Sequence, residues 1–234
     1  MTQNSSEAHG GHSHHDHHHH DDHDHGHDHG HGHEHAPPQP DDKVHSYYQI
    51  LGVALKELLI EKGVVTADEV RAAIEARDAM QPANGAKVVA RAWVDPAYRE
   101  RLLKDANAAT AELGFPMHTT HLVALENTDK VHNVVVCTLC SCYPRELLGL
   151  PPSWYKSKAY RARIVREPRA VLEEFGTPVP GGVEVRVRDS TADLRYLVVP
   201  QRPEGTEGMG EEDLAKLVSR DAMIGVSIVK PPAS

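Results

Sequence analysis

Three cysteines within six residues are the part of this sequence best suited to chemistry. Cys137, Cys140 and Cys142 are the only cysteines of the chain, and we call residues 137–142 the claw. Three thiolates so close together can converge on one soft or borderline metal ion. Three thiols clustered this tightly by chance are improbable, so the spacing favours a metal site over buried thiols without a function.

The spacing alone leaves the kind of metal site open. A structural zinc site normally has four protein ligands, so a histidine would have to complete it. The candidates are His118, His121 and His132. A redox pair of the Cys-x-x-Cys type is less suitable, because Cys142 would crowd it and no thioredoxin-like pattern surrounds it. The third class is a catalytic metal that is held by one short peptide and keeps an open coordination position.

The residues around the claw predict a strand before it and a helix after it. Residues 131–136 are rich in valine, and Pro144 is suited to begin a helix, so the claw should be a strand-to-helix turn. Residues 122–126 and 131–136 flank a polar turn and predict a hairpin. Residues 183–188 and 194–199 predict a second hairpin in the same way.

Helices are predicted on both sides of these strands. Apolar residues recur at helical spacing over residues 50–59, and Thr66 with Glu69 forms a capping-box pattern. Asp95 followed by Pro96 should open a helix that Gly114 ends. Further helices are expected over residues 157–165, 168–175 and 211–218. We therefore expect an α+β fold, with an N-terminal helical arm followed by a mixed α/β core of short strands packed with helices.

The first 42 residues differ from the rest of the chain. They carry nine acids and no lysine or arginine, and 15 of the 19 histidines lie within residues 9–35. A segment so poor in apolar residues should be disordered, and the proline-rich stretch after it should act as a linker. The many imidazoles are suited to weak buffering of divalent transition metals. We expect one folded domain over residues 43–230.

Composition excludes several classes of function. The formal charge of −9 equals that of the tail, so the rest of the 234 residues is neutral and lacks the basic footprint of a nucleic-acid-binding protein. No apolar run is long enough to span a membrane, and no secretory signal opens the chain. The few cysteines are typical of a reducing compartment. We expect a cytoplasmic protein.

The claw, Cys-Thr-Leu-Cys-Ser-Cys, resembles the metal-binding claw of the nitrile hydratase alpha subunit. The resemblance continues in residues 126–132, 148–154, 160–169, 199–206 and 223–225. It covers roughly Tyr47 to Val226. The gamma subunit of thiocyanate hydrolase shares the claw and the fold, and it is therefore the alternative family member.

The resemblance implies an unusual set of ligands. The sulfurs of Cys137, Cys140 and Cys142 and the main-chain nitrogens of Ser141 and Cys142 would bind one low-spin trivalent metal. In the family, the cysteine matching Cys140 is oxidised to sulfinic acid and that matching Cys142 to sulfenic acid. Thr138 matches the cobalt branch, whereas the iron branch tends to have serine there, so we expect one Co(III) per chain and consider iron less suitable.

The implied reaction is hydration of a nitrile to its amide, with Cys142 and Cys140 as the catalytic cysteines. Either a water molecule or the sulfenate oxygen of Cys142 would attack the nitrile carbon. A beta subunit would supply two arginines to the oxidised sulfurs, in a heterodimer or heterotetramer, and a metallochaperone or activator would load the cobalt. The alternatives are a thiocyanate hydrolase subunit, which needs two further chains, and a cobalt storage or delivery protein.

Two positions depart from the family pattern. His118 stands where many relatives have a glutamine near the metal pocket, and Arg145 stands where others have a pocket tryptophan. If both residues line the pocket, it is more polar than in those relatives. Arg145 could favour an anion, which bears on the choice between nitrile and thiocyanate.

Overall fold

The computed structural model describes residues 46–232, so the disordered tail and linker predicted over residues 1–42 lie outside the described residues. The chain divides into two units, and the boundary between them lies between Val53 and Ala54. Helix α1 (Tyr47–Glu61) crosses this boundary. Taken by itself, α1 buries none of its residues. Within residues 46–232, no helix has both the length and the apolar character needed to cross a membrane.

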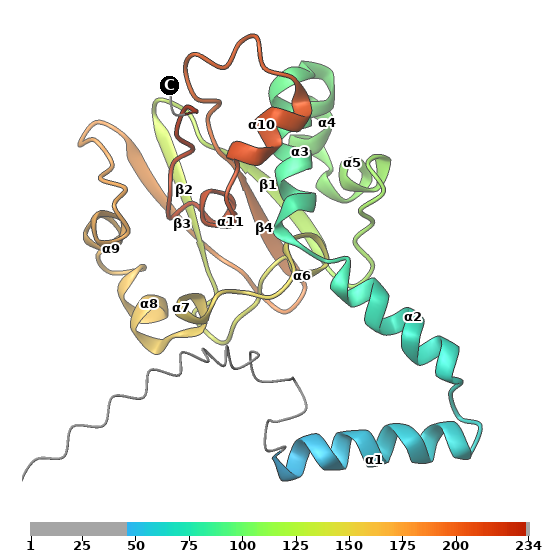
Figure 1. The fold of residues 1–234 in the computed structure, drawn as a ribbon. Helices are drawn as coiled ribbons and strands as arrows, with labels where there is room; N and C mark the ends of the chain where they lie inside the picture. Colours follow the sequence, from blue (N-terminus) through green and yellow to red (C-terminus); the bar gives the residue numbers. More distant parts are fainter. Residues whose placement is uncertain (1–45, 233–234) are drawn as a thin grey trace, which may run out of the picture. The chain divides into compact units, whose positions relative to one another are not determined.

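The four strands of the described chain form two parallel pairs rather than hairpins (Figure 1). Their bounds are β1 (His121–Glu126), β2 (Val131–Val136), β3 (Glu184–Asp189) and β4 (Leu194–Val199). Strand β1 pairs with β4, and β2 pairs with β3. Both predicted hairpins are therefore wrong, although the strands themselves lie where the sequence predicts them.

The short loops between β1 and β2 and between β3 and β4 do not fold the chain back on itself as a hairpin would. Each loop leads from one strand pair into the other. The Asn127 N–H still donates to Val199 O at 2.9 Å, at the end of the β1–β4 pair. Three residues later, Lys130 O accepts from Glu184 N–H at 2.8 Å, at the start of the β2–β3 pair. The chain therefore passes from one pair to the other within the loop.

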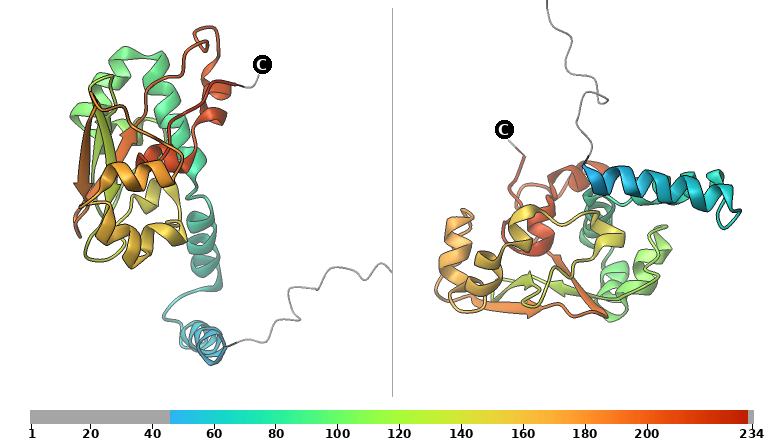
Figure 2. Two further views of the ribbon diagram at one scale, coloured as in Figure 1. Left: turned by 90° about the vertical axis from the view of Figure 1, so that its left-hand side faces the viewer. Right: turned by 90° about the horizontal axis from the view of Figure 1, so that it is seen from below.

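Helices cover these strands and connect them. Their bounds are α2 (Ala67–Asp78), α3 (Pro82–Val94), α4 (Pro96–Lys104), α5 (Ala106–Glu112), α6 (Arg145–Leu148), α7 (Ser153–Lys156), α8 (Lys158–Arg163), α9 (Pro168–Glu174), α10 (Glu211–Leu217) and α11 (Arg220–Ile224). Helices α3 and α11 lie on the same face of the strands (Figure 2). Helices α4 and α5 contact β1, and α9 contacts β3.

The helix starts follow the predicted caps. Thr66 Oγ1 accepts from Glu69 N–H at 3.1 Å, and the Glu69 carboxylate accepts from Thr66 N–H at 2.7 Å, which confirms the capping box. Asp95 caps α4 as predicted. The single helix expected from Asp95 to Gly114 is wrong, because Asp105 accepts from Ala108 N–H at 3.0 Å and starts the separate helix α5.

The core lies between the strands and the helices. The last five residues of β2 and the last three of β4 are buried. Such uninterrupted burial is typical of parallel strands that are covered on both faces. The aromatic ring of Trp154 packs against Tyr160 and Phe175 at centroid distances of 4.9 and 4.8 Å. The α+β class is confirmed.

Candidate metal centre

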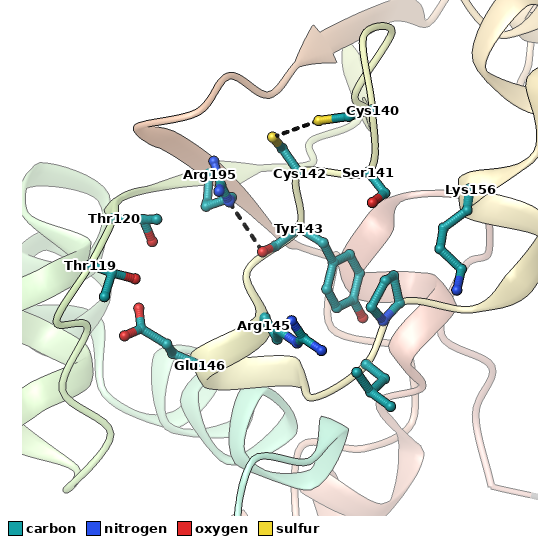
Figure 3. A pocket seen from close by; sticks show the side chains of 12 residues that line it. Thr119, Thr120, Cys140, Ser141, Cys142, Tyr143, Arg145, Glu146, Lys156 and Arg195 are labelled. Carbon is teal, nitrogen blue, oxygen red and sulfur yellow. Dashed lines mark hydrogen bonds between the residues drawn. The ribbon is translucent and has the colours of Figure 1, made fainter. Parts of the chain in front are cut away.

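The claw follows directly after β2 and ends just before α6, which confirms the strand-to-helix turn. The Sγ atoms of Cys137 and Cys140 are 3.4 Å apart, and those of Cys140 and Cys142 are 3.2 Å apart (Figure 3). Cys137 is buried, Cys142 is half-buried and Cys140 is exposed. The deepest sulfur therefore lies at the strand end, and the cluster opens toward the surface.

Hydrogen bonds from outside the claw fix its backbone. The Asp189 carboxylate accepts from Thr138 N–H at 2.9 Å and from the Thr138 hydroxyl at 2.6 Å. The Tyr155 hydroxyl donates to Cys142 O at 2.8 Å. The parallel register places Asp189 opposite Val136, so the last residue of β3 lies beside the first residues of the claw.

The donor set fits one metal ion. The three sulfurs lie within 4.8 Å of one another, which is close enough for all to contact a single ion. Thiolates favour soft or borderline ions. The main-chain amides of Ser141 and Cys142 both stabilise the thiolate of Cys140, so these amides are close to the cluster. The sulfurs and these two amides are the five groups that the family resemblance predicts as ligands.

The metal-free cluster favours one negative charge on Cys140. Hydrogen bonds from the thiols of Cys142 and Cys137 and from the Ser141 amide lower the pKa of the Cys140 thiol to about 7. Burial, followed by the hydrogen bond to Cys140, raises the pKa of the Cys142 thiol to about 12, and the positive charge of Arg195 only partly opposes this rise. Adjacent thiols cannot all ionise without a cation, so binding of a metal would displace protons here.

The histidines considered for a zinc site lie apart from the sulfurs. The group of metal-binding side chains around the claw, within the described residues, contains only the three cysteines. His132 is buried, and its Nε2 atom is 2.7 Å from Gly225 O. His118 and His121 are exposed. The Cys₃His set is therefore not assembled.

A pocket of about 500 Å³ opens at the claw, and Cys140, Ser141 and Cys142 line it (Figure 3). Arg145, which stands where other family members have a pocket tryptophan, also lines this pocket. The His118 side chain is not among the lining residues, but its main-chain N–H donates to the lining residue Glu146 at 3.1 Å. This arrangement is typical of a metalloprotein whose metal faces a ligand pocket.

Comparison with known proteins identifies the family. Residues 46–227 match the family described as nitrile hydratase, alpha chain, and this chain belongs to that family. The alpha subunit of the low-molecular weight cobalt-containing nitrile hydratase of Rhodococcus rhodochrous is 54% identical over 183 residues, which cover 77% of this chain and 88% of that one. The gamma subunit of thiocyanate hydrolase from Thiobacillus thioparus is 43% identical over 206 residues, which cover 83% and 85%.

Solved structures of both activities share the fold. A recombinant thiocyanate hydrolase with partially modified cobalt centres has a TM-score of 0.72 and 39% identity, covering 82% of this chain and 96% of that chain. A double mutant of the Fe-type nitrile hydratase from Comamonas testosteroni Ni1 has a TM-score of 0.71 and 44% identity, covering 81% and 94%. The fold alone therefore does not distinguish cobalt from iron or one activity from the other.

Two positioning residues could not be found from the sequence pattern. Asp189 reaches the claw from 51 positions away, and Tyr155 reaches it from 13 positions after Cys142. The predicted hairpins paired β3 with β4, so they gave no reason to place Asp189 next to Thr138. With β2 and β3 recognised as a parallel pair, a carboxylate at the end of β3 would have been the signal.

Proposed function

We propose that this chain is the metal-bearing alpha subunit of a nitrile hydratase, with one Co(III) held by Cys137, Cys140, Ser141 and Cys142. The observation that carries the proposal is the convergence of three sulfurs at a pocket, in a chain that belongs to the nitrile hydratase alpha-chain family. Cobalt is supported by the cobalt-containing relatives and by Thr138 in the claw. The Fe-type structures make iron the second choice.

The reaction adds water across a carbon–nitrogen triple bond. A bound cobalt ion would act as a Lewis acid toward the nitrile or lower the pKa of a water molecule. One water molecule supplies the oxygen that ends on the nitrile carbon and both protons that end on the nitrogen. If the sulfenate oxygen of Cys142 attacks the carbon first, that water then releases the amide and leaves a new oxygen on the sulfur, which restores the sulfenate. We propose that Cys140 carries the sulfinic acid and Cys142 the sulfenic acid, and that Cys137 remains a thiolate.

The chain's own residues hold this site in place. Asp189 fixes Thr138 near the start of the claw, and Tyr155 fixes the carbonyl of Cys142 at its end. Both contacts restrict the backbone between the ligands, so the main-chain nitrogens of Ser141 and Cys142 stay close to the sulfurs. Outer contacts of this kind orient metal ligands and typically change metal affinity or activity by about 10- to 100-fold.

A beta subunit is supported by the chain's exposed apolar surface. Helix α1 buries no residue, although it contains Tyr47, Tyr48, Ile50, Leu51 and Val53. Tyr48 has 80% of its surface exposed. Large apolar side chains gathered along one exposed helix are typical of an interface with another protein. We propose that a beta subunit covers it and contributes arginines to the oxidised sulfurs, and that an activator protein loads the metal.

Two alternatives remain testable. The similarity to thiocyanate hydrolase, in sequence and in fold, supports a gamma subunit of that enzyme, which would assemble with two further chains. A cobalt storage or delivery protein would depend on the histidine-rich tail, but it would not need a claw that lines a pocket.

Co-expression tests the three proposals together. The chain is produced with the neighbouring subunit genes and cobalt, and the purified complex is assayed with a nitrile and with thiocyanate. Amide formation without thiocyanate turnover supports the nitrile hydratase. Turnover of thiocyanate alone supports the alternative enzyme, and a cobalt-loaded complex without either activity contradicts both enzymes.

A further inference from the structure

The pocket beside the claw has an excess of positive charge. Among residues 46–232, its lining includes the cations Arg145, Lys156 and Arg195, and Glu146 is the only acid in it. In Figure 3 the side chains of Arg145 and Lys156 lie around the ring of Tyr143, whereas the carboxylate of Glu146 points away from them, toward Thr119. The cations come from α6, α7 and β4, so three separate elements bring positive charge to one cavity.

These three cations differ in what they contact. Arg195 is held by carbonyl oxygens, those of Tyr143 at 3.2 Å and Leu194 at 3.1 Å among them, and its charge acts on Cys142. Within residues 46–232, the side chains of Arg145 and Lys156 make no hydrogen bond and no ion pair. Arg195 is therefore tied to the backbone beside the claw, whereas Arg145 and Lys156 present their charges to the pocket.

The positive charge continues beyond this pocket. Arg145 and Leu150 also line an adjoining pocket of about 340 Å³, together with Arg77 and Arg220 and a single acid, Asp78. A cleft that is lined by one sign of charge concentrates ligands of the opposite charge and speeds their entry. A neutral nitrile would gain nothing from this arrangement.

We propose that Arg145 and Lys156 form a subsite for the anionic end of the substrate, which makes the preferred substrate a small nitrile that carries a carboxylate. This inference rests on the proposed nitrile hydratase activity. A guanidinium binds a carboxylate through paired, charge-assisted hydrogen bonds, and the ammonium of Lys156 adds a second positive charge. The nitrile end of the same molecule would then lie toward Cys140 and Cys142, which line the same pocket.

A matched pair of substrates tests the subsite in the cobalt-loaded complex. 3-Cyanopropanoate and butyronitrile share the same four-carbon chain, but only the first carries a carboxylate. We expect the wild-type complex to have the higher kcat/KM for 3-cyanopropanoate. We expect Arg145→Met to lower the ratio of the two kcat/KM values roughly tenfold or more, because a hydrogen bond to a charged group is lost. Lys156→Met should lower the same ratio, and Arg145→Lys should retain only part of it, because lysine keeps the charge but not the paired hydrogen bonds.

Arg166→Met provides the matched control. Arg166 is an exposed cation that does not line the pocket, so its substitution should leave the ratio unchanged. Added salt should lower kcat/KM for 3-cyanopropanoate more than for butyronitrile, because ions screen the attraction. Thiocyanate is assayed in parallel. If the turnover of thiocyanate depends on Arg145 and that of 3-cyanopropanoate does not, the carboxylate assignment is wrong.

Other outcomes also overturn the inference. A wild-type preference for butyronitrile, or an unchanged ratio in both methionine variants, would mean that no anion subsite exists. Loss of subunit assembly in Arg145→Met, measured by size-exclusion chromatography, would assign Arg145 to an interface instead. If the wild-type complex hydrates neither nitrile, the proposed function fails. Isothermal titration with intact 3-cyanopropanoate then tests the subsite separately, with a roughly tenfold weaker Kd expected in Arg145→Met.

Discussion

Asp189 fixes the first step of the claw, because its carboxylate accepts two hydrogen bonds from Thr138. Thr138 follows Cys137 directly in the turn that leads to Cys140, so a loose Thr138 would let the sulfurs of Cys137 and Cys140 move apart. Threonine at this position therefore has a structural role in addition to any bias in the choice of metal. The hydroxyl bond at 2.6 Å is one that serine could also form.

Replacement of Asp189 measures this role. We expect Asp189→Ala to lower cobalt affinity or activity roughly tenfold, because a contact that orients the ligands is removed. The change in the free energy of unfolding should be about 1 kcal/mol, since Asp189 is exposed. Metal content at limiting cobalt and urea denaturation are the measurements. Asp193→Ala, at an exposed acid outside the claw, is the control, and equal cobalt content in both variants would contradict the role.

The thiol chemistry of the metal-free chain gives a second prediction. Because the pKa of Cys140 is about 7, its thiolate fraction rises as the pH increases through 7. Cys142, with a pKa of about 12, stays protonated over the same range. Brief alkylation with iodoacetamide between pH 5 and 9, followed by peptide mass spectrometry, should label Cys140 first, with half of its maximal rate near pH 7. Faster labelling of Cys142 would reverse the assignment of the charge.

The sequence predicts some residues of the site better than others. Cys137, Cys140 and Cys142 converge because they share one short turn, so their spacing alone indicates a metal site. Asp189 and Tyr155 depend on how distant segments pack, and local pattern carries no such information. The claw was therefore predictable from the sequence, whereas the residues that hold it in position were not.

At the scale of elements, the strands were predicted and their pairing was not. A short polar loop between two apolar runs is typical of a hairpin, and residues 127–130 have that character. Asn127 and Lys130 nevertheless bond to different strands, β4 and β3. The near-continuous burial of β2 is typical of a parallel strand, and its run of valines was the available signal against a hairpin. Asp105 similarly divided a predicted helix, because its side chain caps α5.

Gly225 tests how closely α11 packs on β2. It ends α11 at a φ of +88°, and a Cβ atom there would lie 2.0 Å from Asn133 O. Gly205 has a φ of +77°, and a Cβ atom there would meet nothing within 4 Å, so Gly205 isolates the cost of the backbone angle. We expect Gly205→Ala to lower the free energy of unfolding by about 1–2 kcal/mol and Gly225→Ala by about 3–4 kcal/mol. Equal losses in urea denaturation would show that the contact relaxes.

At the scale of the whole molecule, the proposal predicts that turnover depends on a second subunit. Helix α1 leaves most of its large apolar residues exposed, and the claw opens into a pocket at the surface of this chain. We expect the cobalt-loaded chain on its own to show less than about 1% of the turnover of the complex, because the outer contacts to the oxidised sulfurs are missing. Steady-state assays at equal cobalt content compare the two. Turnover by a chain shown by mass spectrometry to lack any second subunit would contradict this dependence.

The most direct test of the central claim is the composition of the claw itself. Metal analysis of freshly isolated, active complex should find about one cobalt per chain, as expected for a single site. Mass spectrometry of the claw peptide should find two added oxygens on Cys140, one on Cys142 and none on Cys137, with the sulfinate of Cys140 as the more durable marker. One zinc per chain with three unoxidised cysteines, in active protein, would contradict both the cobalt assignment and the proposed chemistry.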